Sequence, residues 1–301
     1  METALGYESK LKSHIERERA AVSLSSKVGE LLYDKGIELV LFRNHLLDIT
    51  ISEVLNLHEY SRTVVNKPVD IFTTSELANE LIKLDLAPAK IDIGKLASEY
   101  ITEKADFSSA SEFLSAKLKG FETGNGIPFQ PRDVILYGFG RIGRLAAREL
   151  IKQAGKGQQL RLRAIVTRSN SDEDIIMRAS LLKNDSVHGA FKGTVEVDLP
   201  NKSIIINGQM VKMISANNPE DIDYTAHGIN NALVIDNTGA FTTKEALSRH
   251  LKSKGTSRVL LTAPGKEIPN VVYGINQGDI DLATERIYSA ASCTTNAISP
   301  I

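Results

Sequence analysis

A glycine-rich turn between an apolar run and an amphipathic run constrains the fold of this chain more than any other feature. Residues 134–137 have the apolar character of a buried strand, and Gly138, Gly140 and Gly143 follow them directly. Residues 144–151 then carry apolar side chains at helical intervals. Strand, Gly-x-Gly-x-x-Gly turn and helix in this order are typical of a dinucleotide site, in which glycines allow a tight turn, close approach of the pyrophosphate and close helix packing. The alternative is a βα turn that binds no ligand.

The residues that follow this turn alternate between predicted strands and helices. Such alternation predicts a mostly parallel, doubly wound α/β sheet of the Rossmann type, whose ligands lie beyond the carboxyl ends of the strands. Gly138, Thr238, Thr262 and Cys293 each follow a predicted strand, so we expect them at one edge of the sheet. The further predicted strands are 160–166, 193–197, 203–206, 211–214, 233–236, 258–262, 271–273 and 287–290, with a helix over 243–253.

The residues before this fold predict a separate, all-α N-terminal domain. Glycines and prolines cluster between Gly120 and Pro131, a composition typical of a linker. We therefore divide the chain into a helical N-terminal extension, 1–125, and a dinucleotide-binding domain, 126–301. The expected helices are one ending at Gly36, one over 37–57, and two that open at the capping boxes Thr73-x-x-Glu76 and Ser109-x-x-Glu112. Nothing in its residues indicates what the extension does.

Composition and charge exclude several classes of function. The chain has 301 residues, of which 42% are hydrophobic, and a formal net charge of −1. A balanced charge supplies no basic surface for nucleic acid, and no apolar run reaches the ~20 residues of a membrane span. No residue spacing is typical of a metal site. We therefore expect no nucleic acid, no membrane and no metal as partners, and a cytoplasmic location, since the first residues resemble no export signal.

The only cysteine, Cys293, follows the last predicted strand. One cysteine cannot form an internal disulfide, which fits a reducing compartment. Ser292 before it and Thr294 and Thr295 after it are typical of a polar turn that starts a helix. The N-terminus of a helix stabilises a thiolate, which is the nucleophilic form of the side chain. On these residues alone the other interpretation, a small buried apolar side chain, stays open.

Together, the glycine turn and the cysteine segment closely resemble one family, the phosphorylating glyceraldehyde-3-phosphate dehydrogenases. Residues 138–144 are similar to the cofactor turn of that family, and residues 291–296 to its nucleophile motif. The resemblance covers 132–301 and says nothing about the residues before it. Further similar segments are 186–193, 206–208, 236–243 and 262–264.

The resemblance implies a covalent mechanism at Cys293. The thiolate would attack the aldehyde carbon, hydride would pass to the nicotinamide, and phosphate would cleave the resulting thioester. Ser292 and Thr294 would lie around the bound substrate and phosphate. The cofactor contacts implied by the family pattern, with the pyrophosphate on the N–H groups at 141 and 142, are Gly138, Phe139, Gly140, Arg141, Ile142, Thr238, Gly239 and Thr262.

Cofactor choice is where the sequence departs from this family. The family usually has an acidic residue after the second strand that holds the ribose hydroxyls of NAD, whereas this chain has Thr167, Arg168 and Ser169. An arginine at this point can accommodate a 2′-phosphate, so NADP is a candidate cofactor beside NAD. Two alternatives stay open: Asp172 or Glu173 reaches back to the ribose, or Arg168 is a solvated loop cation.

The family's catalytic domain continues well beyond its nucleophile motif, whereas this sequence stops eight residues after Cys293. We therefore expect a partial sequence of a longer enzyme, with the catalytic histidine, the substrate-phosphate ligands and the oligomer interface outside it. The six histidines present are expected on the surface or in packing, His188 with a structural hydrogen bond. The resemblance implies a small phosphorylated aldehyde and inorganic phosphate as partners, and a homo-oligomer at full length. Glyceraldehyde 3-phosphate is the expected substrate; the alternatives are erythrose 4-phosphate and a non-catalytic dinucleotide-binding scaffold.

Overall fold

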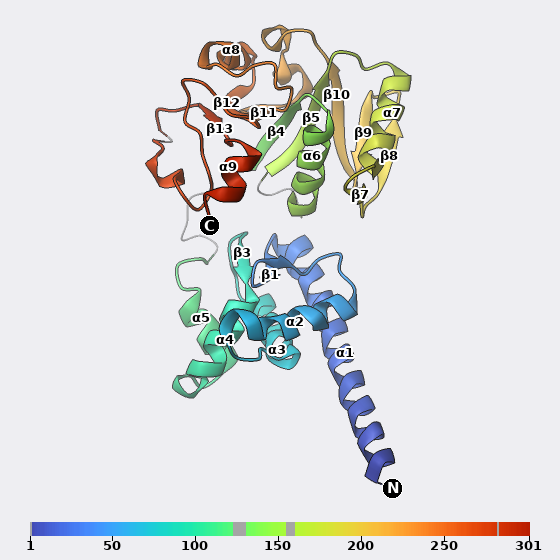
Figure 1. Ribbon diagram of the computed structural model, residues 1–301, viewed down its shortest axis with the longest axis vertical. Helices are drawn as coiled ribbons and strands as arrows, with labels where there is room; N and C mark the ends of the chain where they lie inside the picture. Colours follow the sequence, from blue (N-terminus) through green and yellow to red (C-terminus); the bar gives the residue numbers. More distant parts are fainter. Residues whose placement is uncertain (1, 123–130, 155–159, 282) are drawn as a thin grey trace. The chain divides into compact units, whose positions relative to one another are not determined.

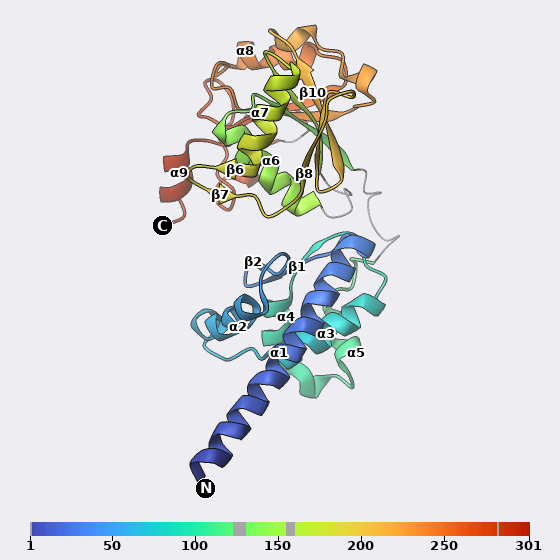
Figure 2. The same ribbon diagram turned by 90° about the vertical axis from the view of Figure 1, so that its right-hand side faces the viewer.

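Two compact units make up the computed structural model, which describes residues 2–122, 131–154, 160–281 and 283–301 (Figures 1 and 2). The described residues up to Glu122 belong to the first unit, and those from Pro131 onward belong to the second. The proposed domain boundary between residues 125 and 126, and most of the predicted linker, lie outside the described residues. None of the described helices combines the length and the apolar character needed to cross a membrane.

The second unit is built on an eight-stranded sheet. Six neighbouring strands run parallel, and two more continue from β10 as an antiparallel meander. Beside it, β6 (Asn184–Asp185) and β7 (Gly189–Ala190) form a two-stranded sheet. The large sheet has the order β13 (Ile287–Ser289), β12 (Thr256–Leu261), β11 (Ala232–Asp236), β4 (Arg132–Tyr137), β5 (Leu160–Thr167), β10 (Gln209–Ser215), β9 (Ser203–Ile206) and β8 (Val195–Asp198).

Apolar side chains cover both faces of this sheet. Helices α6 (Arg141–Ala154) and α7 (Asp172–Lys183) lie on one face, where they share one apolar cluster with the strands. Figure 1 shows both helices in front of the strands. On the opposite face, Leu247 of α8 (Lys244–Ser248) shares an apolar cluster with Val259 and Leu261 of β12 and with Ile287 of β13. The prediction of a doubly wound, Rossmann-type α/β fold is confirmed.

The strand order places a topological switch beside β4. From β4 the chain crosses through α6 to β5 on one side, and later it returns to β11 on the other side. Ligands of open α/β sheets bind beyond the carboxyl ends of the strands at such a point. The loops after β4 and β11 are therefore the first place to look for a ligand site.

The strands predicted in this unit are confirmed, with one exception and with ends shifted by at most two residues. Residues 271–273 form no strand: residues 271 and 272 are irregular and residue 273 begins a turn. The Val272 N–H donates to the side chain of Asn276, and the Gly274 N–H to that of Gln277. The predicted helix over 243–253 consists of α8 and the 3-10 helix η4 (Arg249–Lys252). Helix α7 has no counterpart among the predicted elements.

The first unit combines helices with a small sheet, so the prediction of an all-α domain is wrong in this respect. Strand β1 (Glu38–Leu41) pairs antiparallel with β2 (Asn44–His45) and parallel with β3 (Lys90–Asp92). Helices and β1 enclose one apolar core, and the N-terminal turns of α1 extend beyond the rest of this unit (Figures 1 and 2). The helices are α1 (Glu2–Lys35), α2 (Ile51–Val65), α3 (Ile71–Lys83), α4 (Ile93–Glu103) and α5 (Ala110–Lys117), with the 3-10 helix η1 (Lys104–Asp106).

The predicted helix over 37–57 is wrong because a hairpin occupies its first half. Phe42 and Arg43 adopt φ angles of 47° and 69°, a region that non-glycine residues rarely enter. Both N–H groups donate to the carboxylate of Asp92, at 2.9 and 3.2 Å. A side chain 50 residues away from Phe42 therefore stabilises a turn that local propensity disfavours.

The helix ends in this unit follow their capping residues. Gly36, with a φ of 69°, ends α1 and Ser109 caps α5, both as predicted. The pattern beginning at Thr73 does not open a helix, because Asp70 already caps α3 and accepts a hydrogen bond from the Thr73 N–H. A capping box that was not predicted, beginning at Thr50, starts α2.

Candidate functional site

Five predicted site residues follow five neighbouring strands of the large sheet. Arg168 follows β5, Gly138 follows β4, Thr238 follows β11, Thr262 follows β12 and Cys293 follows β13. Because these strands are parallel, the five residues lie at the same carboxyl edge. Neighbouring strands are about 4.8 Å apart, so this row of residues extends over roughly 20 Å. We call it the carboxyl-edge row.

The three glycines of the turn after β4 have different steric surroundings. Gly138 has a φ of 91° and donates its N–H to the Val166 carbonyl at 2.9 Å, which continues the pairing of β4 with β5 into the turn. A Cβ atom on Gly143 would lie 2.4 Å from the carbonyl oxygen of Gly138, so α6 packs on the turn at a distance that only glycine allows. A Cβ atom on Gly140 would meet nothing within 4 Å. The turn is therefore open at Gly140.

Helix α6 begins directly after this open position. The first N–H groups of a helix have no acceptor within the helix, and the helix dipole favours an anion there. Arg141 and Ile142, whose N–H groups are the predicted pyrophosphate ligands, are the first residues of α6, and the Ile142 side chain is exposed. Phe139 is 3% exposed and packs in the core below the turn. The Phe139 side chain thus anchors the turn, while the backbone after it faces outward.

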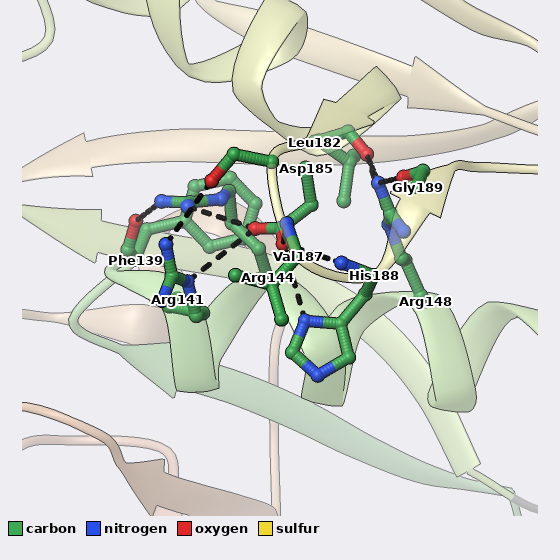
Figure 3. Close-up of polar contacts among 10 residues, drawn as sticks. Phe139, Arg141, Arg144, Arg148, Leu182, Asp185, Val187, His188 and Gly189 are labelled. Atoms are coloured by element: carbon green, nitrogen blue, oxygen red, sulfur yellow. Dashed lines mark hydrogen bonds and ion pairs between the residues drawn. The ribbon is translucent and has the colours of Figure 1, made fainter.

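A carboxylate with little exposure, Asp185, connects α6 to the loop between β6 and β7 (Figure 3). Its Oδ1 accepts hydrogen bonds from the N–H groups of Val187 and His188, both at 2.9 Å, and lies 3.1 Å from the His188 ring Nδ1. Its Oδ2 lies 3.4 Å from Arg144 and 3.7 Å from Arg141. These contacts, the His188 N–H first, hold the pKa of Asp185 well below its usual range. His188 makes the structural hydrogen bond that was predicted.

Because folding lowers the pKa of Asp185, its contribution to stability depends on pH in a defined direction. The contribution is fully present above the ordinary carboxyl pKa of about 3.9 and is lost as the pH falls from there toward the folded-state pKa. We expect Asp185→Asn to lower the free energy of unfolding near neutral pH, and the difference from wild type to shrink below about pH 4. Urea unfolding across this range measures it, with the exposed Asp279→Asn as control. A difference that stays constant down to about pH 3 would contradict the prediction.

A pocket of about 250 Å³ lies beside Gly138 at the β5 end of the carboxyl-edge row. The rings of Tyr137 and Phe241 give it an apolar wall, and Arg168 and Arg178 supply two guanidinium groups. Of the described residues that line it, none carries a carboxylate. An adenosine group needs an apolar surface for its base and polar groups for its ribose, and this pocket provides both.

The two acidic residues expected as alternative ribose ligands lie outside this pocket. Asp172 forms an ion pair with Lys202, with 2.6 Å between Oδ1 and Nζ, and Glu173 is exposed on α7. The next acid, Asp174, accepts a hydrogen bond from the Ser169 hydroxyl. Among Arg168, Asp172 and Glu173, the three charged residues considered for the ribose end of the cofactor, only Arg168 lines the pocket.

The two threonines of the carboxyl-edge row are fixed by Asp236 at the end of β11. Its Oδ1 accepts hydrogen bonds from the Thr238 N–H at 2.8 Å and from the Thr238 hydroxyl at 2.7 Å. Its backbone carbonyl accepts from the N–H and from the hydroxyl of Thr262, both at 3.0 Å. Gly239, with a φ of 70°, turns the chain directly after Thr238. One residue therefore sets the positions of both threonines.

Cys293 is the first residue of α9 (Cys293–Ile298), and both its thiol and Thr294 are exposed. Ser292 caps α9 through its hydroxyl, so the predicted helix-starting turn is confirmed and a buried apolar role for the cysteine is wrong. Ala291 adopts a φ of 56°, a conformation that costs a non-glycine residue about 1 kcal/mol. The Asn296 amide donates to the carbonyls on both sides of Ala291, at 2.7 and 2.9 Å, and holds this turn.

Comparison with known proteins assigns the second unit. Residues 132–244 match the domain described as "Glyceraldehyde 3-phosphate dehydrogenase, NAD binding domain". A "Glyceraldehyde-3-phosphate dehydrogenase-like protein" of Pseudomonas aeruginosa (strain UCBPP-PA14) is 41% identical over 278 residues, which are 91% of this chain and 60% of that protein. Residues 132–244 therefore form an NAD-binding domain of the glyceraldehyde-3-phosphate dehydrogenase family.

Relatives within the glyceraldehyde-3-phosphate dehydrogenase family are longer than this chain. The "Glyceraldehyde-3-phosphate dehydrogenase" of Lactococcus lactis subsp. lactis (strain IL1403) is 41% identical over 165 residues, 54% of this chain and 45% of that protein. The chain thus spans about half of the Lactococcus protein and 60% of the Pseudomonas protein. Because the Pseudomonas match covers 91% of this chain, it includes much of the first unit as well.

Several residues that shape this candidate site were not predicted from the sequence. Arg178 lies on α7, a helix that was itself missed. Asp185 and Asp236 each accept several hydrogen bonds that hold neighbouring loops, and Asn296 holds the turn before Cys293. Asp236 and Asn296 lie within segments that resemble the family, and Asp185 directly precedes another such segment. The resemblance was therefore the only sequence signal for these three residues.

Proposed function

We propose that this chain supplies the cofactor site and the nucleophile of an NAD(P)-dependent enzyme that oxidises and phosphorylates glyceraldehyde 3-phosphate. The observation that carries the proposal is the carboxyl-edge row from Arg168 to Cys293. A pocket with an apolar wall lies at one end, the open backbone at Gly140 lies in the middle, and an exposed thiol lies at the other end. These are the surroundings that an adenosine, a pyrophosphate and an aldehyde beside a nicotinamide require.

In the proposed reaction Cys293 forms and then releases a covalent bond to the substrate. The thiolate attacks the aldehyde carbon, and the carbonyl oxygen takes a proton to give a thiohemiacetal. Loss of that hydroxyl proton and of hydride leaves a thioester, and a dinucleotide held by the cofactor residues would supply the oxidant for this loss. Inorganic phosphate then attacks the thioester carbon and displaces the thiolate, which yields an acyl phosphate. Our proposal names no residue of this chain as the base that removes the proton.

An assay of the full-length gene product tests this proposal. We expect steady-state formation of reduced cofactor when glyceraldehyde 3-phosphate and inorganic phosphate are both present, and none when phosphate is omitted. Faster turnover of erythrose 4-phosphate would identify the alternative substrate. Cofactor binding without turnover of either aldehyde would favour a dinucleotide-binding scaffold, a function that the attached first unit motivates. A cytoplasmic homo-oligomer is the setting we propose for the enzyme.

We further propose that NADP is used at least as well as NAD. Arg168 and Arg178 both line the adenosine-sized pocket, and the Nε of Arg178 is buried without a hydrogen-bond partner in the described part of the chain. A hydrogen bond to a charged group contributes about 1.5–3 kcal/mol. Replacing either arginine by alanine is therefore expected to weaken NADP binding by about tenfold or more and NAD binding by less than about twofold.

Titration of both cofactors into the 301-residue chain and its variants measures these affinities. Arg286→Ala is the matched control, because Arg286 directly precedes β13 and so lies at the opposite, amino edge of the sheet. A wild-type chain that strongly prefers NAD, with a preference unchanged by Arg168→Ala and Arg178→Ala, would show that neither arginine binds a 2′-phosphate.

A further inference from the structure

The carboxylate that fixes Thr238 belongs to a pair that is completely buried. Asp236 and His250 are both 0% exposed, and 2.9 Å separates the His250 Nε2 from the Asp236 Oδ2. A carboxylate without a proton only accepts hydrogen bonds, so Nε2 carries the proton in this contact. His250 lies on η4, after the α8 crossover, whereas Asp236 ends β11 beside the topological switch. The pair therefore connects the crossover segment to the strand end at the candidate site.

The polar contacts of this pair run from His250 through Asp236 to the carboxyl-edge row. The second ring nitrogen of His250, Nδ1, is buried and has no partner within the described residues, so the hydrogen bond of this ring goes to Asp236. The remaining contacts of Asp236 go to Thr238 and Thr262 of the carboxyl-edge row. The carboxylate thus fixes Thr238, whereas the backbone carbonyl of the same residue holds Thr262.

Two aromatic rings connect the same histidine to the adenosine-sized pocket. The ring of Tyr137 lies edge-on to the His250 ring with 4.7 Å between centroids, and the ring of Phe241 with 5.7 Å. Both rings line the pocket, whereas neither His250 nor Asp236 lines it. Burial, and after it the negative charge of Asp236, raises the pKa of Tyr137 to about 12. The pair of His250 and Asp236 therefore lies directly behind the pocket wall.

Stability alone explains such a pair poorly. Removing a carboxylate and an imidazole from water is costly, and replacing both partners of a buried hydrogen bond by apolar groups of the same shape can be nearly neutral or stabilising. At a completely buried position, where apolar packing is available, a purely structural requirement favours apolar side chains. The contacts of Asp236 with two loops at the ligand edge offer a more specific reason for the pair.

We propose that His250 and Asp236 are positioning residues of the dinucleotide site. His250 orients the Asp236 carboxylate, and Asp236 holds Thr238 and Thr262 in the geometry that binds the cofactor. This inference rests on the cofactor site proposed above and extends it by two residues that do not line the pocket.

Titration of NAD and NADP into the 301-residue chain tests the inference. His250→Leu removes the hydrogen bond to Asp236 and is expected to weaken binding of both cofactors by about tenfold or more. His250→Gln keeps an N–H donor for the carboxylate, so we expect it to bind within about threefold of wild type. Thr238→Val is expected to weaken binding similarly to His250→Leu. Because the two changes act through one network, the double variant is expected to lose much less than the product of both effects.

Two control variants separate positioning from a loss of stability. Val234→Ala truncates a fully buried side chain of β11 and is expected to lower the unfolding midpoint while leaving cofactor affinity unchanged. His227→Leu changes an exposed histidine of the same unit and is expected to change neither.

Unchanged affinity in the His250→Leu chain would overturn the inference. Should that variant fail to fold, Asp236→Asn takes its place: it keeps the side-chain shape but replaces one acceptor oxygen by a donor, and the same loss is expected. Failure of the wild-type chain to bind either cofactor would overturn the proposed cofactor site itself, a result distinct from equal binding by wild type and variant.

Discussion

Replacing Cys293 by serine is expected to reduce the kcat/KM of the full-length gene product by about a thousandfold or more. A serine hydroxyl is not ionised near neutral pH, whereas a cysteine thiol supplies a reactive thiolate. The exposed position of Cys293 at the start of α9 leaves this atom accessible to an aldehyde. Steady-state assays with glyceraldehyde 3-phosphate, phosphate and cofactor measure the effect.

Cofactor affinity provides the control for this variant. Cys293 does not line the adenosine-sized pocket, so NAD and NADP are expected to bind Cys293→Ser within about twofold of wild type. Because Cys293 is the only cysteine of the 301 residues, alkylation of this chain is expected to modify one site. Serine-substituted enzyme that keeps more than about a tenth of the wild-type turnover would remove Cys293 from the mechanism.

Replacing Gly143 by alanine is expected to destabilise the second unit by about 3 kcal/mol. The added Cβ would lie 2.4 Å from the backbone carbonyl of Gly138, and a backbone atom cannot move aside as a flexible side chain can. Relief requires α6 to shift away from the turn that it packs against. Urea unfolding of the 301-residue chain measures the loss in the free energy of unfolding.

Gly140→Ala is the matched comparison, because its Cβ would meet no atom within 4 Å. We expect an unfolding free energy within about 0.5 kcal/mol of wild type. Cofactor affinity is nevertheless expected to fall by about tenfold or more, since the new methyl group stands where the proposed pyrophosphate approaches the backbone. Equal losses of stability in both variants, or unchanged affinity in Gly140→Ala, would contradict the roles assigned to the two glycines.

The strands of the second unit were predictable because their signals are local. Apolar runs end at glycine turns, and Asn207 and Gly208 adopt the positive φ angles, 46° and 77°, that this dipeptide favours in a hairpin. The hairpin in the first unit lacks such a signal. Its turn residues, Phe42 and Arg43, are poor choices for positive φ, and they take it because Asp92 binds their N–H groups.

In the candidate site, too, the residues with a local sequence signal were predicted and the residues placed by tertiary contacts were not. Residues that follow a strand directly, such as Thr238 and Cys293, are placed by the general geometry of parallel sheets, which a sequence pattern can reveal. The residues that hold them are brought in by tertiary structure. His250 is 14 residues from Asp236 and lies in a different element, so no period of one helix or strand relates the two residues and their spacing gave no reason to pair them.

Asp92 gives the first unit a cooperative folding requirement. The same carboxylate oxygen that accepts from Phe42 also accepts from the N–H groups of Gly94 and Lys95, and so starts α4. The hairpin and the start of α4 therefore lose their stabilisation together. Both depend on the parallel pairing of β1 with β3, which closes a loop of some fifty residues, and the entropic cost of that closure precedes any gain from the contacts. The helices of this unit are thus expected to fold slowly and as one body rather than one after another.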